Sequence, residues 1–178
     1  MFKHLIIYAF FYACACFAQI VNPVTIDVTS DSLVRAGEVV NIEVSAKMEK
    51  QWKIYSMYKI VDGPLPTEIN IKGDIISEIG KVIEPEPIEE YDPGFDVTSF
   101  YHKGNTLFSS QVLLKDDLTP GNYEISVMTY YQVCNERLCY PPVEKKIVDK
   151  IKAEPGEPRV EKSILTSLEK NHNEKNGL

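Results

Sequence analysis

The chain has 178 residues, of which 44% are hydrophobic and 25% are charged, and its 19 basic and 26 acidic side chains give a formal net charge of −7. This acidic balance, without a basic cluster, argues against nucleic acid or an anionic membrane surface as a partner. The length suffices for one domain with its own hydrophobic core.

The N-terminal segment has the pattern of an export signal. A short basic start precedes an apolar run over residues 5–17, and Ala18 completes an acceptable cleavage site. The run is shorter than the roughly 20 residues that span a bilayer. Residues 1–18 are therefore predicted to be a cleaved signal peptide, which leaves an exported mature chain without an integral membrane segment.

Two of the four cysteines, Cys14 and Cys16, lie inside this signal and are expected to be small apolar members of it. Lipid attachment at Cys16 is the less favoured alternative, because Ala13 stands where lipoprotein signals usually carry a bulky aliphatic residue. Export leads to an oxidising compartment, in which the remaining cysteines, Cys134 and Cys139, can persist as a disulfide.

The middle of the chain alternates between apolar and polar residues with period two, as in half-buried antiparallel strands. The clearest example is 39–46, and a Pro-Gly turn at 118–121 introduces a strand rich in β-branched and aromatic residues. Strands are predicted at 24–28, 39–46, 68–72, 106–114, 123–131 and 143–148. With the turn residues between them, seven or more short strands predict an all-β, immunoglobulin-like antiparallel β-sandwich over residues 19–152.

Residues 84–94 interrupt the strand pattern with three prolines and five acidic side chains. Such a composition excludes a central strand. It predicts a long exposed loop, and the two interpretations of that loop are a functional element and a solvated connector.

The chain becomes polar from Ala153 onward, and a Pro-Gly-Glu-Pro stretch at 155–158 separates it from the preceding strand. Residues 153–178 are therefore predicted to form a flexible or loosely docked C-terminal extension. Within it, residues 163–170 have the pattern of a short amphipathic helix, which would be marginally stable alone.

Cys134 and Cys139 are separated by four residues and precede a proline pair. If they face each other across an antiparallel hairpin, their Cα atoms lie about 4.5–5.5 Å apart, which suits a disulfide. Closing so short a loop contributes only about 2 kcal/mol through the unfolded state, and this favours a disulfide kept for reactivity. Arg137 would promote a thiolate and Glu136 would oppose it. The pair is thus either a structural disulfide or a redox centre.

Other candidate residues have simpler interpretations. For His102, the alternatives are a base near the thiols and an exposed, idle loop residue, and the second is expected. For Trp52 and Tyr55, the alternatives are lining of the cysteine site and core residues on a strand, and the core is expected. Tyr130 and Tyr131 point to opposite faces of their strand, so at most one reaches the cysteines. No metal-ligand cluster or phosphate-binding loop stands out, so no metal and no cofactor are expected.

The stretch 131–142, with the pattern Tyr-Gln-x-Cys, a short spacer and Cys-x-Pro-Pro, resembles the active-site hairpin of the N-terminal periplasmic domain of DsbD, a transmembrane thiol-disulfide reductase. Residues 118–123 are similar to that family as well. Residues 52–56 resemble its early aromatic strand, and residues 100–101 resemble the aromatic pair of the cap loop that covers its disulfide. The resemblance spans about residues 24–150 and implies an immunoglobulin-like fold with the cysteines on neighbouring strands.

The resemblance also implies a function, which is the passage of electrons from a thioredoxin-like donor to oxidised periplasmic proteins. By the family's pattern, Cys139 attacks and Cys134 resolves the resulting mixed disulfide. Phe100 would shield the pair and Tyr55 would line the site. The partner-binding residues that the resemblance implies are Phe100, Tyr101, Tyr55 and Tyr140.

Three features depart from the best-known members of that family. The spacer is one residue shorter, and Thr98 and Ser99 replace an acidic pair, although Asp96 is close. The chain carries no membrane helices or thioredoxin-like domain after its tail, so a separate thioredoxin-fold donor is expected to act on a monomer. The alternative function is a non-catalytic exported β-sandwich that binds a partner and uses a structural disulfide.

Overall fold

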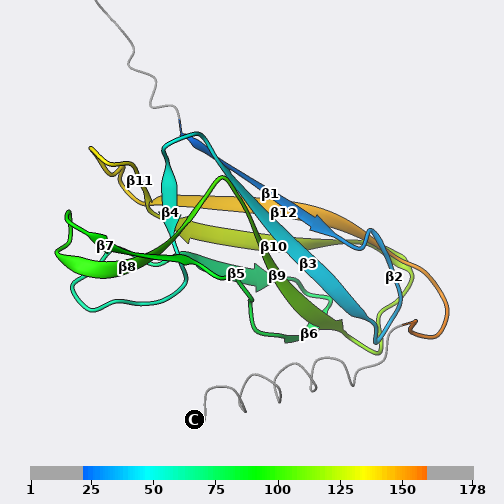
Figure 1. Ribbon diagram of the computed structural model, residues 1–178. Helices are drawn as coiled ribbons and strands as arrows, with labels where there is room; N and C mark the ends of the chain where they lie inside the picture. Colours follow the sequence, from blue (N-terminus) through cyan, green and yellow to red (C-terminus); the bar gives the residue numbers. More distant parts are fainter. Residues whose placement is uncertain (1–21, 160–178) are drawn as a thin grey trace, which may run out of the picture.

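The computed structural model describes residues 22–159, and twelve strands but no helix occupy this part of the chain. The predicted signal peptide, both of its cysteines and the predicted helix at 163–170 lie outside the described residues. Within the described range there is accordingly no helix that could cross a membrane. The fold is an immunoglobulin-like antiparallel β-sandwich (Figure 1).

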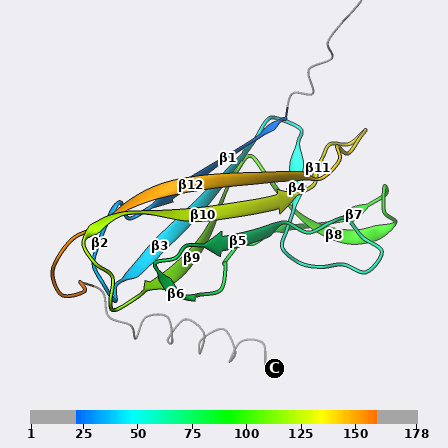
Figure 2. The same cartoon turned by 180° about the vertical axis from the view of Figure 1, so that it is seen from behind.

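Two four-stranded sheets form the body of the sandwich. The first has the order β1 (Val24–Ser30), β3 (Val39–Met48), β9 (Asn105–Leu114) and β6 (Ile76–Ile79). The second has the order β2 (Leu33–Val34), β12 (Val143–Ala153), β10 (Gly121–Tyr131) and β5 (Glu68–Lys72). Every pairing in them is antiparallel except that of β12 with β2. Seen from behind, β10 and β12 run side by side along the length of the molecule (Figure 2).

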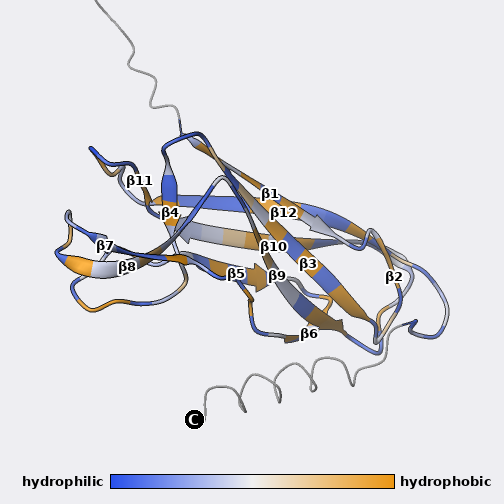
Figure 3. Ribbon diagram, in the orientation of Figure 1, coloured by the Kyte–Doolittle hydropathy of each residue, from blue (hydrophilic) through white to orange (hydrophobic). Residues whose placement is uncertain are grey.

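The core lies between these two sheets because alternate residues of each strand point inward. Along β3 the buried and exposed positions follow the period-two pattern, which appears as alternating colours in Figure 3. Ile42 and Phe108 of the first sheet meet Val127 and Ile151 of the second in one apolar cluster. Each such side chain contributes about 1.5–3 kcal/mol when fully buried. The predicted strands are thus confirmed by the packing that their pattern requires.

A third sheet extends from one end of the sandwich, where Figure 1 shows β4, β7, β8 and β11. Its order is β11 (Val133–Cys134), β4 (Lys53–Tyr55), β8 (Val97–Lys103) and β7 (Ile88–Asp92). All of its strands pair in antiparallel fashion. This sheet carries both aromatic segments named above and begins at the cysteine hairpin.

The prediction of one long exposed loop at residues 84–94 is wrong for its second half. Ile88–Asp92 form β7, which pairs with β8 along one side and lies at the outer edge of the third sheet. An edge strand needs ladder bonds on one side only, and the prolines at 85, 87 and 93 fall outside the paired stretch. The acidic composition therefore excluded a central strand but not an edge strand.

The start of the C-terminal extension packs against the sandwich. Ala153 is the last residue of β12 and is buried, and Arg159 reaches back to the buried carboxylate of Glu38 with its side chain 2.7 Å away. The backbone N–H groups of Arg35 and Arg159 donate to the same carboxylate. The side-chain hydrogen bond from Arg159 and these backbone bonds outweigh burial and lower the pKa of Glu38.

Replacing this carboxylate tests the attachment. Glu38→Gln is expected to lower the free energy of unfolding at pH 7 by about 1–3 kcal/mol, because charged hydrogen bonds to a buried acceptor are lost. The folded-state pKa of Glu38 lies below the unfolded value, so its stabilisation is complete above the unfolded pKa and disappears as pH falls through the folded one. Urea unfolding at a series of pH values should show the two proteins converging in acid.

The matched control is Glu154→Gln, which removes a 3.5 Å ion pair with the exposed side chain of Lys152. A loss below about 1 kcal/mol is expected there. Equal losses in the two variants, or a Glu38 effect that persists in acid, would contradict the attachment of the extension through Glu38.

Candidate functional site: a disulfide beside a Lys–Asp–Tyr cluster

Cys134 and Cys139 are joined by a disulfide across a tight hairpin, with a Cα–Cα distance of 4.1 Å. The two residues face each other in an isolated antiparallel bridge, as the hairpin interpretation of the spacing predicted. The four-residue turn is closed by a backbone bond from Asn135 N to Leu138 O, and the Asn135 side chain accepts two further N–H bonds of the turn. The hairpin thus has its own backbone support besides the disulfide.

The two sulfur-bearing residues differ in exposure. Cys134 is 1% exposed and packs in a small cluster with Tyr55 and Tyr101, against which Phe95 rests. Cys139 is exposed at the rim of the hairpin. An external thiolate must approach a disulfide sulfur directly, so the difference in exposure favours Cys139 over Cys134 as the point of attack.

One face of the third sheet lies next to the disulfide. In the strand register Cys134 is opposite Lys53, and Tyr55 is opposite Tyr101. Directly opposed residues point to the same side and side chains alternate along a strand, so these four side chains share one face. Asp92 of β7 also belongs to it through its pairing with Val97 on β8.

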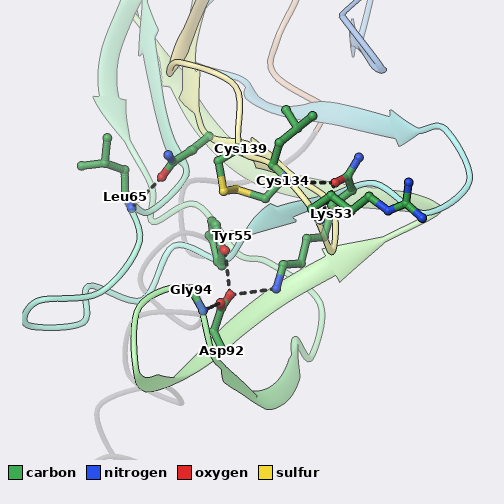
Figure 4. Close-up of a disulfide and its surroundings, with 11 residues drawn as sticks. Lys53, Tyr55, Leu65, Asp92, Gly94, Cys134 and Cys139 are labelled. Atoms are coloured by element: carbon green, nitrogen blue, oxygen red, sulfur yellow. Dashed lines mark hydrogen bonds and ion pairs between the residues drawn. A yellow bond between two sulfur atoms is a disulfide. The ribbon is translucent and has the colours of Figure 1, made fainter.

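Asp92 collects three hydrogen bonds on that face, as Figure 4 shows. Its Oδ2 accepts from the Lys53 ammonium at 2.9 Å and from the Tyr55 hydroxyl at 2.7 Å. Its Oδ1 accepts from the backbone N–H of Gly94 at 3.0 Å. Burial opposes ionisation of Asp92, but these bonds outweigh it and lower the pKa of the carboxyl. We call Lys53, Asp92 and Tyr55 the Lys–Asp–Tyr cluster.

The tyrosines of this face stay protonated under ordinary conditions. Burial, with the hydrogen bond to Asp92, raises the pKa of Tyr55 far above its usual value. Burial, with a hydrogen bond to Glu90, raises the pKa of Tyr101 to about 12. The Lys53 ammonium lies 4.6 Å from the Tyr101 ring centre and 5.1 Å from that of Tyr55, within the range of cation–π attraction. Both hydroxyl groups therefore act as hydrogen-bond donors, and both aromatic rings pack against Cys134.

The aromatic residues that the sequence singled out are divided between two places. Tyr55 and Tyr101 join Cys134, and Tyr140 stacks on Trp52 beside the hairpin with ring centres 4.9 Å apart. Phe100 lies on the opposite face of β8, where it meets Tyr58 edge-on at 5.4 Å. The structure therefore does not bring Phe100 to the disulfide cluster, and the phenylalanine that rests there is Phe95 of the β7–β8 turn.

The prediction that His102 is an exposed loop residue is wrong. It lies in β8, is 4% exposed and contacts the Glu84 carboxylate through Nε2 at 2.9 Å and Phe108 of the core edge-on. The alternation along β8 turns it to the face away from Cys134. Among residues 22–159, no group of three or more His, Cys, Asp or Glu side chains is arranged to hold a metal ion.

Sequence reasoning did not identify Lys53, Asp92 or Phe95 as members of the site. The period-two pattern does place Lys53 on the same face as Tyr55. Asp92 carried no such signal, because it belongs to a segment that was expected to be a loop, and Phe95 directly follows that segment. Their position follows from the pairing of β7 with β8.

Comparison with known proteins adds an independent finding. The family model described as thiol:disulfide interchange protein DsbD, N-terminal, matches residues 22–150. The N-terminal periplasmic domain of ScsB from Proteus mirabilis is similar in structure, with a TM-score of 0.50 and 15% identity over 69% of this chain but 45% of that one. The DsbD N-terminal domain of Neisseria meningitidis, in the reduced form, gives a TM-score of 0.42 and 17% identity over 71% of this chain and 90% of that one. No curated protein sequence matches the chain.

Proposed function

Because the chain belongs to the family of the N-terminal domain of the thiol:disulfide interchange protein DsbD, we propose that it is a periplasmic thiol-disulfide oxidoreductase domain. In this role the Cys134–Cys139 pair passes reducing equivalents from a thioredoxin-fold donor to oxidised exported proteins. The observation that carries the proposal is the disulfide itself, whose exposed residue, Cys139, lies on a self-supporting hairpin while its partner is buried.

Reduction begins when a donor thiolate attacks Cys139 Sγ in line with the S–S bond. A donor–Cys139 disulfide forms, the Cys134–Cys139 bond breaks, and its electron pair leaves on Cys134 Sγ. The second thiolate of the donor then attacks the donor sulfur that is bonded to Cys139, and Cys139 is released as a thiolate. The donor departs as a disulfide, and the domain has gained two electrons.

Delivery reverses these roles. The Cys139 thiolate attacks a client disulfide, and one client sulfur leaves as a thiolate. Cys134 then attacks Cys139 Sγ, which restores the domain's disulfide and releases the second client thiolate. In this proposal Tyr55 and Tyr101 wall off Cys134, Phe95 takes the shielding role that the resemblance implied for Phe100, and Tyr140 faces the partner.

A structural disulfide in a non-catalytic binding domain is the second candidate, and the burial of Cys134 among aromatic rings favours it. The two functions differ in reduction potential. A structural disulfide is expected below about −300 mV and a catalytic dithiol above it.

Equilibration of the protein with dithiothreitol or glutathione redox buffers measures this potential. We expect a value above about −300 mV, and a melting temperature that reduction changes by only a few degrees, because the hairpin keeps its backbone bonds. A potential below about −300 mV together with a large loss of stability on reduction would replace the exchange function by the structural one.

A further inference from the structure

We propose that Lys53 stabilises the thiolate that forms on Cys134 when the disulfide opens, and that Asp92 and Tyr55 hold Lys53 in place for this purpose. Its part in exchange rests on the function proposed above, whereas its effect on Cys134 is a property of the domain alone. Lys53 would then set how readily Cys134 leaves and how readily it later resolves a mixed disulfide.

The sheet register carries this inference. Lys53 on β4 is directly opposite Cys134 on β11. Opposed side chains of an antiparallel pair share a face, with Cβ atoms about 4.5–5.5 Å apart. The Lys53 side chain is 16% exposed and its ammonium lies over Tyr55 and Tyr101, the two rings that pack against Cys134. Figure 4 shows the Lys53 side chain running beneath the disulfide toward Asp92.

A countercharge at this place would favour the chemistry of the exchange. When a thiolate attacks Cys139, the electron pair of the S–S bond passes to Cys134, and no proton is transferred in that step. The new negative charge is buried, and burial in an apolar environment raises the pKa of a thiol and disfavours the thiolate. A leaving thiol of lower pKa leaves faster. A cation within 4–6 Å lowers the pKa of such a group by about one to three units.

The Lys–Asp–Tyr cluster suits this role because it orients the ammonium and leaves donors free. A lysine ammonium has three N–H donors, and the structure shows one of them on Asp92. Tyr55 donates to the same carboxylate oxygen, so Asp92 keeps a partner if Lys53 shifts toward the sulfur. The carboxylate also moderates the charge of Lys53 while the disulfide is closed.

The remaining groups around Cys134 do not supply the same countercharge. Lys103 lies on β8, which is one strand further from Cys134 than β4, and its ammonium is 4.9 Å from the centre of the Tyr101 ring. Arg137 and Glu136 are exposed and of opposite sign, so solvent and each other screen them. The charged and titratable groups that face Cys134 from its neighbouring elements are Lys53 and Tyr55 on β4, Tyr101 and Lys103 on β8, Glu90 and Asp92 on β7, and Glu136 and Arg137 in the hairpin turn.

The test is the titration of Cys134 in a Cys139→Ser protein, followed by the NMR shift of carbon-13-labelled cysteine. Adding Lys53→Met is expected to raise the pKa of Cys134 by about one unit or more. Lys53→Arg, which keeps the charge, should leave the pKa of Cys134 close to its value in the Cys139→Ser protein that retains Lys53. Lys103→Met is the matched control and should change the pKa by less than a third as much.

In the protein with both cysteines, Lys53→Met should slow reduction by dithiothreitol roughly threefold, as a leaving-group effect of this size predicts. An unchanged or lower Cys134 pKa in Lys53→Met, or an equal shift in Lys103→Met, would overturn the proposal. If the Lys53→Met protein does not fold, the Lys53→Arg protein takes its place in the test. A rise in the pKa of Cys134 in a folded Lys53→Arg protein, which keeps the positive charge, would also overturn the proposal. If the protein failed to exchange disulfides with any thioredoxin-fold protein, the proposed function would be rejected. The effect of Lys53 on the pKa of Cys134 would still be tested by the titration.

Discussion

A Cys134→Ser protein is expected to accumulate as a covalent complex with a thioredoxin-fold partner, linked through Cys139. Cys139 is the exposed member of the pair and can attack a partner disulfide. Among residues 22–159, which contain only these two cysteines, the loss of Cys134 leaves no second thiol to resolve the mixed disulfide that results. Electrophoresis without reductant, followed by mass spectrometry of the cross-linked peptides, would identify both the partner and the cysteine.

The Cys139→Ser protein is the matched control, and its exchange activity should fall to background. Its remaining thiol, at Cys134, is 1% exposed beneath Tyr55 and Tyr101 and is out of reach of a second protein. Equal trapping by the two serine variants would contradict the assignment of Cys139 as the attacking thiol. The absence of a complex with any exported or thioredoxin-fold protein would remove the main support for the exchange function.

Asp92→Ala is expected to lower the free energy of unfolding at pH 7 by about 2–4 kcal/mol, since it leaves the Lys53 ammonium and the buried Tyr55 hydroxyl without their shared acceptor. The pKa of Asp92 is lowered in the folded protein. Its stabilisation is therefore complete above the unfolded pKa and is lost as pH falls through the folded one. Urea unfolding at neutral and acidic pH measures both effects.

Glu89→Ala, three residues earlier on the same strand, provides the comparison because Glu89 is exposed. Its effect should stay within about 0.5 kcal/mol. Asp92→Asn should fall between the two, because the amide oxygen still accepts a hydrogen bond but carries no charge. If Asp92→Ala lowered the free energy of unfolding no more than Glu89→Ala, the Lys–Asp–Tyr cluster would not stabilise the third sheet.

The sandwich was predictable from the sequence because its strands bury one face. Ile42 and Val44 on β3 alternate with polar residues, and this period alone indicates a strand and its inward side. The edge strand β7 was not predictable, since four of its five residues are exposed and no alternation distinguishes it from a loop. His102 was misread for a related reason, because its burial comes from the core beneath β8 rather than from its neighbours in sequence.

The sequence by itself determined the sandwich and the spacing of a cysteine pair suited to a hairpin disulfide, since both depend on residues close together in the chain. Only the tertiary structure decided which cysteine faces solvent, that Phe95 rather than Phe100 rests on the disulfide cluster, and that Lys53 meets a carboxylate 39 residues away. Those facts depend on how β11, β4, β8 and β7 pair, and pairing between distant strands follows from the fold as a whole.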